Sequence, residues 1–267
     1  MRVIVTRPGP QAGKWVKALR EAGHEAFALP LIEITQPADA SAVEAAWQRL
    51  ADFDALMFVS ANAATFFFSL RPSASEPLQW GASLPRCLAT GPGTVAALLK
   101  AGVPQSAVDA PAEDATQFDS EALWHVVQGR IVSGIRVLIV RGLTQDDGDA
   151  GEGAATGSGR EWFAERVREQ GGVVEFVVAY KRSAPVLGIN ALALARVAAA
   201  DGSIWLFSSS EAVLNLQSAV PGQRWGQARA VASHPRIAQA ARDAGFGQVL
   251  ESRPALPELI ASIESFV

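Results

Sequence analysis

The chain has 267 residues, 49% of them hydrophobic and 19% charged, so it can build packed cores and is too apolar for disorder. Such a length favours two domains over one. The formal net charge of −4 excludes the basic surface typical of nucleic-acid binding, and no apolar run has the length of a bilayer span. A single cysteine excludes an internal disulfide and fits a reducing compartment, so we expect a cytoplasmic protein.

Short β-rich runs alternate with helical patterns along the chain. The runs that predict strands occupy residues 2–6, 27–29, 55–59, 87–89, 108–110, 137–140, 173–185, 204–207, 229–232 and 248–251. Helices are predicted at 12–22, 42–50, 95–101, 115–127, 160–170, 190–200 and 257–266, with further helices opening at 60–62, 208–210 and 233–235. This alternation predicts an α/β fold with parallel sheets flanked by helices.

Residues 143–159 interrupt the alternation with a low-complexity stretch, LTQDDGDAGEGAATGSG. It is acidic at first and then consists mainly of glycine and other small residues, which bury little apolar surface. The composition predicts a mobile loop.

The two halves of the chain resemble each other. RVIVTRP at 2–8 is echoed by RVLIVRG at 136–142, residues 54–67 by 203–216, and residues 87–103 by 230–246. The repeat predicts two similar flavodoxin-like lobes, one discontinuous (1–36 and 183–267) and one contiguous (37–182). Both crossings between them fall in matching extended segments, 29–37 and 174–184, which predicts a two-stranded β ribbon that joins the lobes and acts as a hinge.

Small and hydroxyl residues gather where predicted strands lead into helices, the places where parallel α/β sheets bind ligands. These residues are Ser60, Ala61, Asn62, Gly91, Gly93, Thr94, Ser208, Ser209, Ser210 and Ser233. Each could serve only to cap its helix. Recurrence in both lobes favours a second interpretation, that helix N-termini facing a cleft bind carboxylates or phosphates through backbone amides. Arg7 and Arg141, at equivalent strand ends, are either further anion partners or surface charges.

A dinucleotide site is a weaker alternative. Residues 91–96, GPGTVA, fit the glycine fingerprint, and Asp109 follows Gly91 by 18 residues. However, Pro92 has no amide to offer a pyrophosphate, and no set of residues for nicotinamide chemistry is visible. The three histidines lack metal-ligand spacing, so we expect no metal site.

The only tyrosine, Tyr180, lies in the stretch VVEFVVAYKRSAP at 173–185. The split repeat, VAYKR on the returning strand, the SANA and SSSEA junctions and the TGPGT turn together resemble the uroporphyrinogen-III synthase family. The resemblance covers essentially the whole chain. The sequence departs from the family pattern in the long segment 143–159 and at 233–235, where a glycine-containing turn is more usual.

The resemblance implies an enzyme that converts hydroxymethylbilane, a linear tetrapyrrole, into uroporphyrinogen III by dehydration, cyclisation and inversion of ring D, without metal or cofactor. Tyr180 matches the tyrosine that helps the substrate hydroxyl to leave, and a phenol protonated at neutral pH can donate that proton. Ser60, Thr94, Ser208 and Ser210 match positions near the substrate's carboxylates. We expect a monomer without nucleic-acid or membrane partners, in transient contact with the preceding enzyme of the pathway.

A binding protein of the same architecture is the rival hypothesis. Two lobes with anion-binding helix N-termini could capture an anionic ligand without catalysis. Incubation with hydroxymethylbilane separates the two, because the free substrate cyclises to the type I isomer and only an enzyme yields type III.

Overall fold

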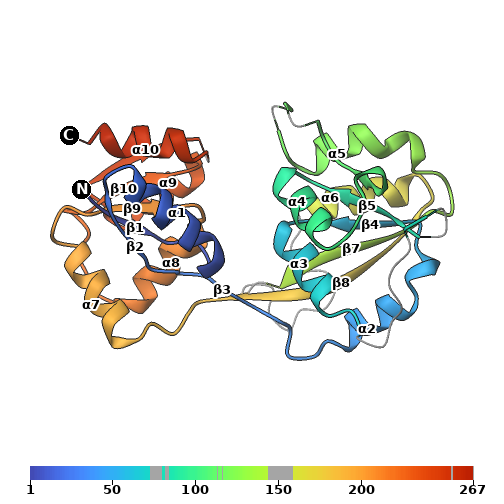
Figure 1. Ribbon diagram of the computed structural model, residues 1–267, viewed down its shortest axis with the longest axis horizontal. Helices are drawn as coiled ribbons and strands as arrows, with labels where there is room; N and C mark the ends of the chain where they lie inside the picture. The colour runs from blue at the N-terminus through green and yellow to red at the C-terminus, as the bar shows by residue number, and fades with distance from the viewer. Residues whose placement is uncertain are drawn as a thin grey trace. The chain divides into compact units, whose positions relative to one another are not determined.

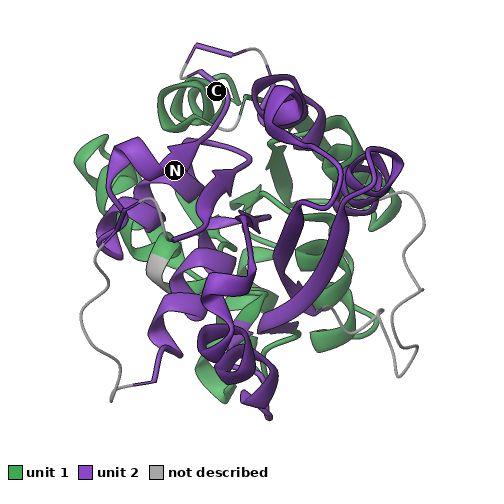
Figure 2. Ribbon diagram, turned by 90° about the vertical axis from the view of Figure 1, so that its right-hand side faces the viewer, with its two compact units in different colours: residues 1–33, 183–267 green, residues 34–182 purple. Residues whose placement is uncertain are grey.

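The computed structural model describes residues 1–72, 80–81, 84–112, 114–115, 117–143, 159–253 and 255–266. It divides into two compact units, Met1–Glu33 with Ser183–Val267 as unit 1 and Ile34–Arg182 as unit 2 (Figure 2). Strands alternate with helices in each unit, and the predicted α/β fold with parallel sheets is confirmed. The predicted loop 143–159 lies, except for its two end residues, outside the described residues.

Unit 1 contains a five-stranded parallel sheet in the order β11-β10-β9-β1-β2 (Figure 1). Its elements are β1 (Arg2–Val5), α1 (Gly9–Glu21), β2 (Glu25–Ala28), α7 (Ile189–Ala198), β9 (Ile204–Phe207), α8 (Ser210–Ala219), β10 (Arg229–Ala232), α9 (Pro235–Asp243), β11 (Gln248–Glu251) and α10 (Leu256–Glu264).

Side chains alternate between the two faces of the unit 1 sheet. Val3, Val5 and Leu206 pack with α1 and α10 in one core. Trp205 and Phe207, their neighbours along β9, join an aromatic group on the other side with Trp225 and Phe246. The strands are therefore buried on both faces, as a parallel sheet requires.

Unit 2 carries a six-stranded sheet in the order β3-β8-β7-β4-β5-β6, in which β8 through β6 pair in parallel. Its strands are β3 (Glu33–Thr35), β4 (Ala55–Phe58), β5 (Arg86–Ala89), β6 (Val108–Asp109), β7 (Arg136–Leu143) and β8 (Val173–Ser183). Its α-helices are α2 (Ser41–Gln48), α3 (Ala61–Ser69), α4 (Pro92–Lys100), α5 (Ser120–Val127) and α6 (Gly159–Glu169). Short 3₁₀ helices occupy Leu50–Asp52, Gln105–Ala107 and Gln128–Arg130.

The two faces of the unit 2 sheet have separate cores. Leu56 and Phe58 of β4 pack with α2, α3 and α4, whereas Ala55 and Met57 pack with α5 and α6. Alternate residues along each strand therefore point to opposite faces of the sheet, and each face is covered by its own set of helices.

The internal repeat of the sequence corresponds to a shared strand order. Reading β11-β10-β9-β1-β2 against β6-β5-β4-β7-β8 pairs β1 with β7, β9 with β4 and β10 with β5, as the repeated sequences do. β2 and β8 begin 148 residues apart, at Glu25 and Val173. The two sheets are therefore repeats of one topology.

Several predicted boundaries were wrong. In the segment 29–37 only Glu33–Thr35 is a strand. Leu29 and Leu31 are buried, and their amides donate to the carbonyl oxygens of Val5 and Thr6 at 2.9 and 3.2 Å, so this part of the segment continues the packing of unit 1. Pro30 between them has no amide to extend a strand ladder.

β7 is longer than the predicted strand at 137–140, because its partner β8 continues to Ser183 and the pairing resumes after a shift between Arg141 and Gly142. Arg141 is therefore inside a strand. Conversely, α5 begins at Ser120, later than the predicted 115, where the Asp119 side chain accepts a hydrogen bond from the Ala122 amide at 2.8 Å.

Candidate active site

Tyr180 lies on β8 directly opposite Gly142 of β7. A Cβ atom added at Gly142 would overlap the Tyr180 ring, so the ring occupies the space above a residue without a side chain. Phe66 of α3 stacks on the same ring with centroids 6.0 Å apart, and Tyr180 is only 5% exposed. The ring is therefore fixed between the sheet and α3.

The Tyr180 hydroxyl has one hydrogen-bond partner among the described residues, Ser60 Oγ at 3.2 Å. Ser60 caps α3, and its Oγ accepts a hydrogen bond from the Ala63 amide at 3.1 Å. Since the amide uses only an acceptor site of Oγ, the serine hydroxyl can donate its proton to Tyr180 Oη. The phenol proton then remains free for a third group.

The N-termini of α3 and α4 follow neighbouring strands at the same level of the sheet, because Phe58 pairs with Ala89 across β4 and β5. In the part of the chain that the structure describes, the amides of Ala61, Asn62 and Gly93 have no hydrogen-bond acceptor. Free amides at helix N-termini bind anions. The predicted residues Ser60 to Asn62 and Gly91 to Thr94 thus lie with Tyr180 at one edge, the carboxyl edge of the unit 2 sheet.

Arg141 points away from this group. Its guanidinium lies over Phe176, 5.6 Å from the ring centroid, and Phe176 packs in the core with α5 and α6. Its Nε is buried and has no hydrogen-bond partner among the described residues. Arg141 therefore belongs to the opposite face of the sheet from Tyr180.

The remaining predicted residues lie at the carboxyl edge of the unit 1 sheet. Arg7 follows β1, Ser208 and Ser209 follow β9, and Ser233 follows β10, three neighbouring parallel strands. Ser209 is the N-cap of α8 and makes no side-chain capping bond, and Ser210 is the first helical residue.

Ser233 does not cap its helix, and Arg7 is held in place by neighbouring side chains. His234 rather than Ser233 caps α9, since its Nδ1 accepts from the Arg236 amide at 3.1 Å, while the Ser233 amide donates to the Phe207 carbonyl. Arg7 is held over the Trp15 ring at 4.0 Å and donates to Gln11 at 3.2 Å. Burial lowers the pKa of the Arg7 guanidinium.

Gly142 and Phe66 were missed in the sequence. A glycine inside a strand commonly marks the close approach of another group, so the Arg141-Gly142 pair in a β-rich run was the available signal for Gly142. Phe66 had no comparable signal, because it is one of three consecutive phenylalanines and only the packing of α3 selects it.

The lone Cys87 takes no part in this group. Burial raises the pKa of its thiol to about 12, which keeps it protonated at neutral pH. Among the described residues, His, Cys, Asp and Glu do not form a group of three or more that could hold a metal ion. Of the helices that the structure describes, none combines the length and apolarity that crossing a membrane requires.

A sequence model of the family described as uroporphyrinogen-III synthase HemD matches residues 13–261. The chain belongs to the uroporphyrinogen-III synthase family. Its function is accordingly that of a uroporphyrinogen-III synthase in tetrapyrrole biosynthesis.

Two solved structures have a similar fold. A mutant uroporphyrinogen III synthase of the bacterium Thermus thermophilus is 13% identical, with a TM-score of 0.56 over 99% of this chain and 98% of the other. The uroporphyrinogen-III synthetase of Helicobacter pylori is also 13% identical, with a TM-score of 0.51 over 100% of both chains. At such identity these structures support the parallel α/β fold and not the role of any residue.

Proposed function

We propose that Tyr180 is the proton donor with which this synthase starts the conversion of hydroxymethylbilane to uroporphyrinogen III. The single observation that carries the proposal is the hydrogen bond of 3.2 Å between Tyr180 Oη and Ser60 Oγ, at a sheet edge with unsatisfied helix amides. In this proposal Ser60 donates to Oη, and the phenol O–H is directed at the substrate hydroxyl.

The first step breaks the bond between the hydroxymethyl carbon and its oxygen. Tyr180 supplies a proton to the departing oxygen, which leaves as water, and the substrate becomes an azafulvene cation. The Ser60 hydroxyl stabilises the phenolate that remains. Ring D then attacks through its substituted carbon and forms a spiro-linked ring. The bond from that carbon to the methylene that joins ring D to ring C breaks and re-forms at the other α carbon of ring D, and the proton lost from that α carbon returns Tyr180 to its neutral form. The protein orients the chain of rings and supplies no nucleophile.

We further propose that helix N-termini hold the eight carboxylates of the substrate. The net charge of −4 makes attraction by the whole protein an unsuitable source of affinity. Among the described residues of unit 2, the amides of Ala61, Asn62 and Gly93 have no acceptor, and Ser60 and Thr94 are their neighbours in the chain.

The carboxyl edge of unit 1 is proposed to bind carboxylates through Arg7 and the N-terminus of α8. Arg7 is fixed by Trp15 and Gln11, so it loses little side-chain freedom when it binds an anion. The assignment of two lobes, 1–36 with 183–267 and 37–182, joined by a ribbon of strands 29–37 and 174–184, remains a proposal. It is supported by the crossings of the chain between the units near Glu33 and Ser183.

The assay for this function is incubation with hydroxymethylbilane followed by separation of the oxidised porphyrin isomers. We expect the type III isomer to form far faster than the spontaneous type I product, without added metal or cofactor. Type I product alone, at the rate of the enzyme-free control, would refute the proposal. A lower rate that is restored only by an added protein or ligand would refute the assignment of the whole reaction to this chain.

A further inference from the structure

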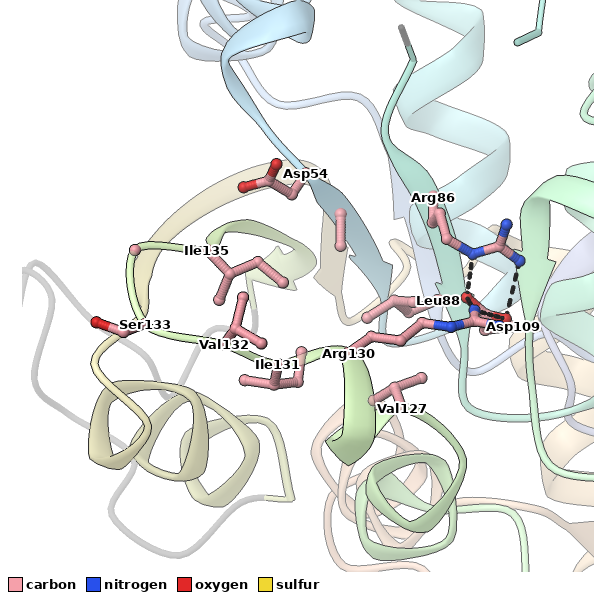
Figure 3. Close-up of a pocket in the computed structure, with 12 residues that line it drawn as sticks. Asp54, Arg86, Leu88, Asp109, Val127, Arg130, Ile131, Val132, Ser133 and Ile135 are labelled. Carbon is pink, nitrogen blue, oxygen red and sulfur yellow. Dashed lines mark hydrogen bonds and ion pairs between the residues drawn. The ribbon is translucent and has the colours of Figure 1, made fainter. Parts of the chain in front are cut away.

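Unit 2 has a pocket of about 470 Å³ at the amino ends of its strands, apart from the sheet edge that carries Tyr180. Asp54 and Ala55 at the start of β4, Arg86 at the start of β5, and the segment from Val127 to Ile135 line it (Figure 3). Ser60 and Tyr180 lie beyond the other ends of the same strands. Because a strand advances about 3.3 Å per residue, the pocket and the Tyr180 hydroxyl are separated by the length of the sheet.

The base of this pocket is apolar. Leu88, Val127 and Ile131 are 2%, 2% and 5% exposed, and Val132 at the mouth is 60% exposed. Figure 3 shows Ile131, Val132 and Ile135 gathered on one side of the pocket. A pocket of this volume with this lining is suited to the hydrocarbon part of a small molecule.

The polar side of the pocket consists of Asp109 between two arginines. Arg86 Nη2 donates to one Asp109 oxygen at 2.9 Å and Arg86 Nε donates to the other, while Arg130 Nη1 lies 2.7 and 2.8 Å from the two oxygens. Asp109 is 8% exposed. One carboxylate thus faces two guanidinium groups, and the second carboxylate of the lining, that of Asp54, makes no ion pair with them among the described contacts.

Arg130 has donors to spare. Within the part of the chain that the structure describes, it hydrogen bonds only through Nη1, and its side chain is 60% exposed. A guanidinium has five N–H donors, so Nε and Nη2 can bind a second carboxylate. Asp54 lies on the far side of the pocket from Arg86 in Figure 3, and its carboxylate accepts from the Arg136 amide at 2.8 Å.

We propose that this pocket is a binding site for a small organic acid with an apolar body. The carboxylate binds Arg130 beside Arg86, and the hydrocarbon part lies on Leu88, Val127 and Ile131. Because Asp54 also lines the pocket, its two arginines and two aspartates balance in charge, and the carboxylate is selected by the unused donors of Arg130; the apolar base disfavours an inorganic anion alone. A bound acid connects the segment from Val127 to Ile135 with the strand ends and so stabilises unit 2. The reaction at Tyr180 does not use this site.

The test uses 3-phenylpropanoate as the probe and its uncharged amide, 3-phenylpropanamide, as the matched compound. Amide chemical shifts of the full-length isotope-labelled protein are followed during titration with each. We expect the acid to shift residues 54–55, 86–88 and 127–135, with a Kd of about 1 mM or tighter. We expect the amide to bind at least about fivefold more weakly, because it lacks the charge-assisted bond to Arg130.

Two variants separate the site from general effects of charge. Arg130→Gln removes the charged donor, and Val132→Asp places a negative charge at the mouth. Each is expected to weaken binding of 3-phenylpropanoate by at least about fivefold. Val126→Asp is the matched control: Val126 is 47% exposed on α5 and does not line the pocket. It is expected to bind like the wild type.

Three results would overturn the proposal. They are the absence of saturable shifts up to 10 mM probe (about tenfold above the expected Kd), equal binding of acid and amide, and shifts confined to the other sheet edge around Ser60, Gly93 and Gly142. Turnover of hydroxymethylbilane by Val132→Asp and Val126→Asp serves as the check of folding and is expected at the wild-type rate. If the wild-type protein failed to turn over hydroxymethylbilane, this test would still stand, because it measures binding of the probe to the pocket and not activity.

Discussion

The two units repeat one strand order, yet their corresponding edges carry different chemistry. In unit 2, β7 and β8 have 8 and 11 residues and extend to the Gly142–Tyr180 pair. Their counterparts in unit 1, β1 and β2, have 4 residues each and end before Thr6 and Leu29. The longer strands of unit 2 are what bring a phenol and a serine together at its edge.

The two units also differ in the pair of residues that follows the matching part of β1 and β7. The sequence repeat aligns Arg7-Pro8 with Arg141-Gly142. In unit 1 the proline leads into α1 and the arginine stays at the sheet edge, over Trp15. In unit 2 the glycine continues the strand and admits the Tyr180 ring. The repeat thus keeps its scaffold while its two copies carry different residues at the end of the strand.

The largest effect on the difference between the two units is expected from removing the phenol oxygen of Tyr180. Tyr180→Phe is expected to lower kcat by about two orders of magnitude, the usual contribution of a general acid, with KM nearly unchanged. The type III isomer should remain the enzymatic product, because orientation is imposed by the rest of the site. Single-turnover rates with isomer analysis measure both. A wild-type rate would show that Tyr180 is only a strand residue.

Filling the space above β7 should have the next largest effect. Gly142→Ala forces the Tyr180 ring aside, since the added Cβ overlaps it. We expect kcat to fall by about tenfold or more, up to the roughly hundredfold loss that a misplacement of 1 Å can cause.

Gly13→Ala is the matched control for that substitution, because a Cβ at Gly13 meets nothing within 4 Å. In a Tyr180→Ala background, Gly142→Ala should cost nothing further, as coupled residues are not additive. If the two changes multiply instead, Gly142 acts independently of the ring.

For unit 1 the expected effect is on binding. Arg7→Gln should raise KM by about tenfold and leave kcat unchanged, the loss of one charge-assisted hydrogen bond. Steady-state kinetics at two salt concentrations test this, with Arg196→Gln as an exposed control on α7. A lower kcat at constant KM would place Arg7 in the chemical step.

The smallest expected effect concerns stability at the amino edge of unit 2. Burial favours the neutral form of Asp109, but the hydrogen bonds and charges of Arg86 and Arg130 outweigh it and hold the pKa of this carboxyl below its usual value. A carboxyl whose pKa is lower in the folded state contributes stability above its unfolded pKa of about 3.9, and that contribution is lost as the pH falls through the folded value.

Asp109→Asn should therefore lower the melting temperature at pH 7, and the difference should shrink as the pH falls below about 4. Asp243→Asn on the exposed side of α9 provides the control for a surface carboxylate. A difference that stays constant from pH 7 to the acid range would mean that packing, not charge, accounts for the loss.

The sequence alone determined the fold class, the repeat and the family. Each rests on a local or periodic signal: β-rich runs alternating with helices, matched segments such as RVIVTRP and RVLIVRG, and VAYKR with its single tyrosine. Ser60 and Thr94 could also be placed at helix starts, because capping depends on residues adjacent in the chain.

Only the tertiary structure decided which residues meet. The contact of Tyr180 with Ser60 spans 120 positions and depends on the order of β4, β7 and β8, on the bulge after Arg141, and on the length of β8. Arg7 and Arg141 were predicted at equivalent strand ends, yet Arg141 lies inside β7, and the alternation of side chains places it on the opposite face from Tyr180. The pocket at the amino ends of the strands depends in the same way on Arg86, Asp109 and Arg130, which no spacing in the sequence links. Such contacts follow from strand pairing between distant segments, and that is the information that local patterns lack.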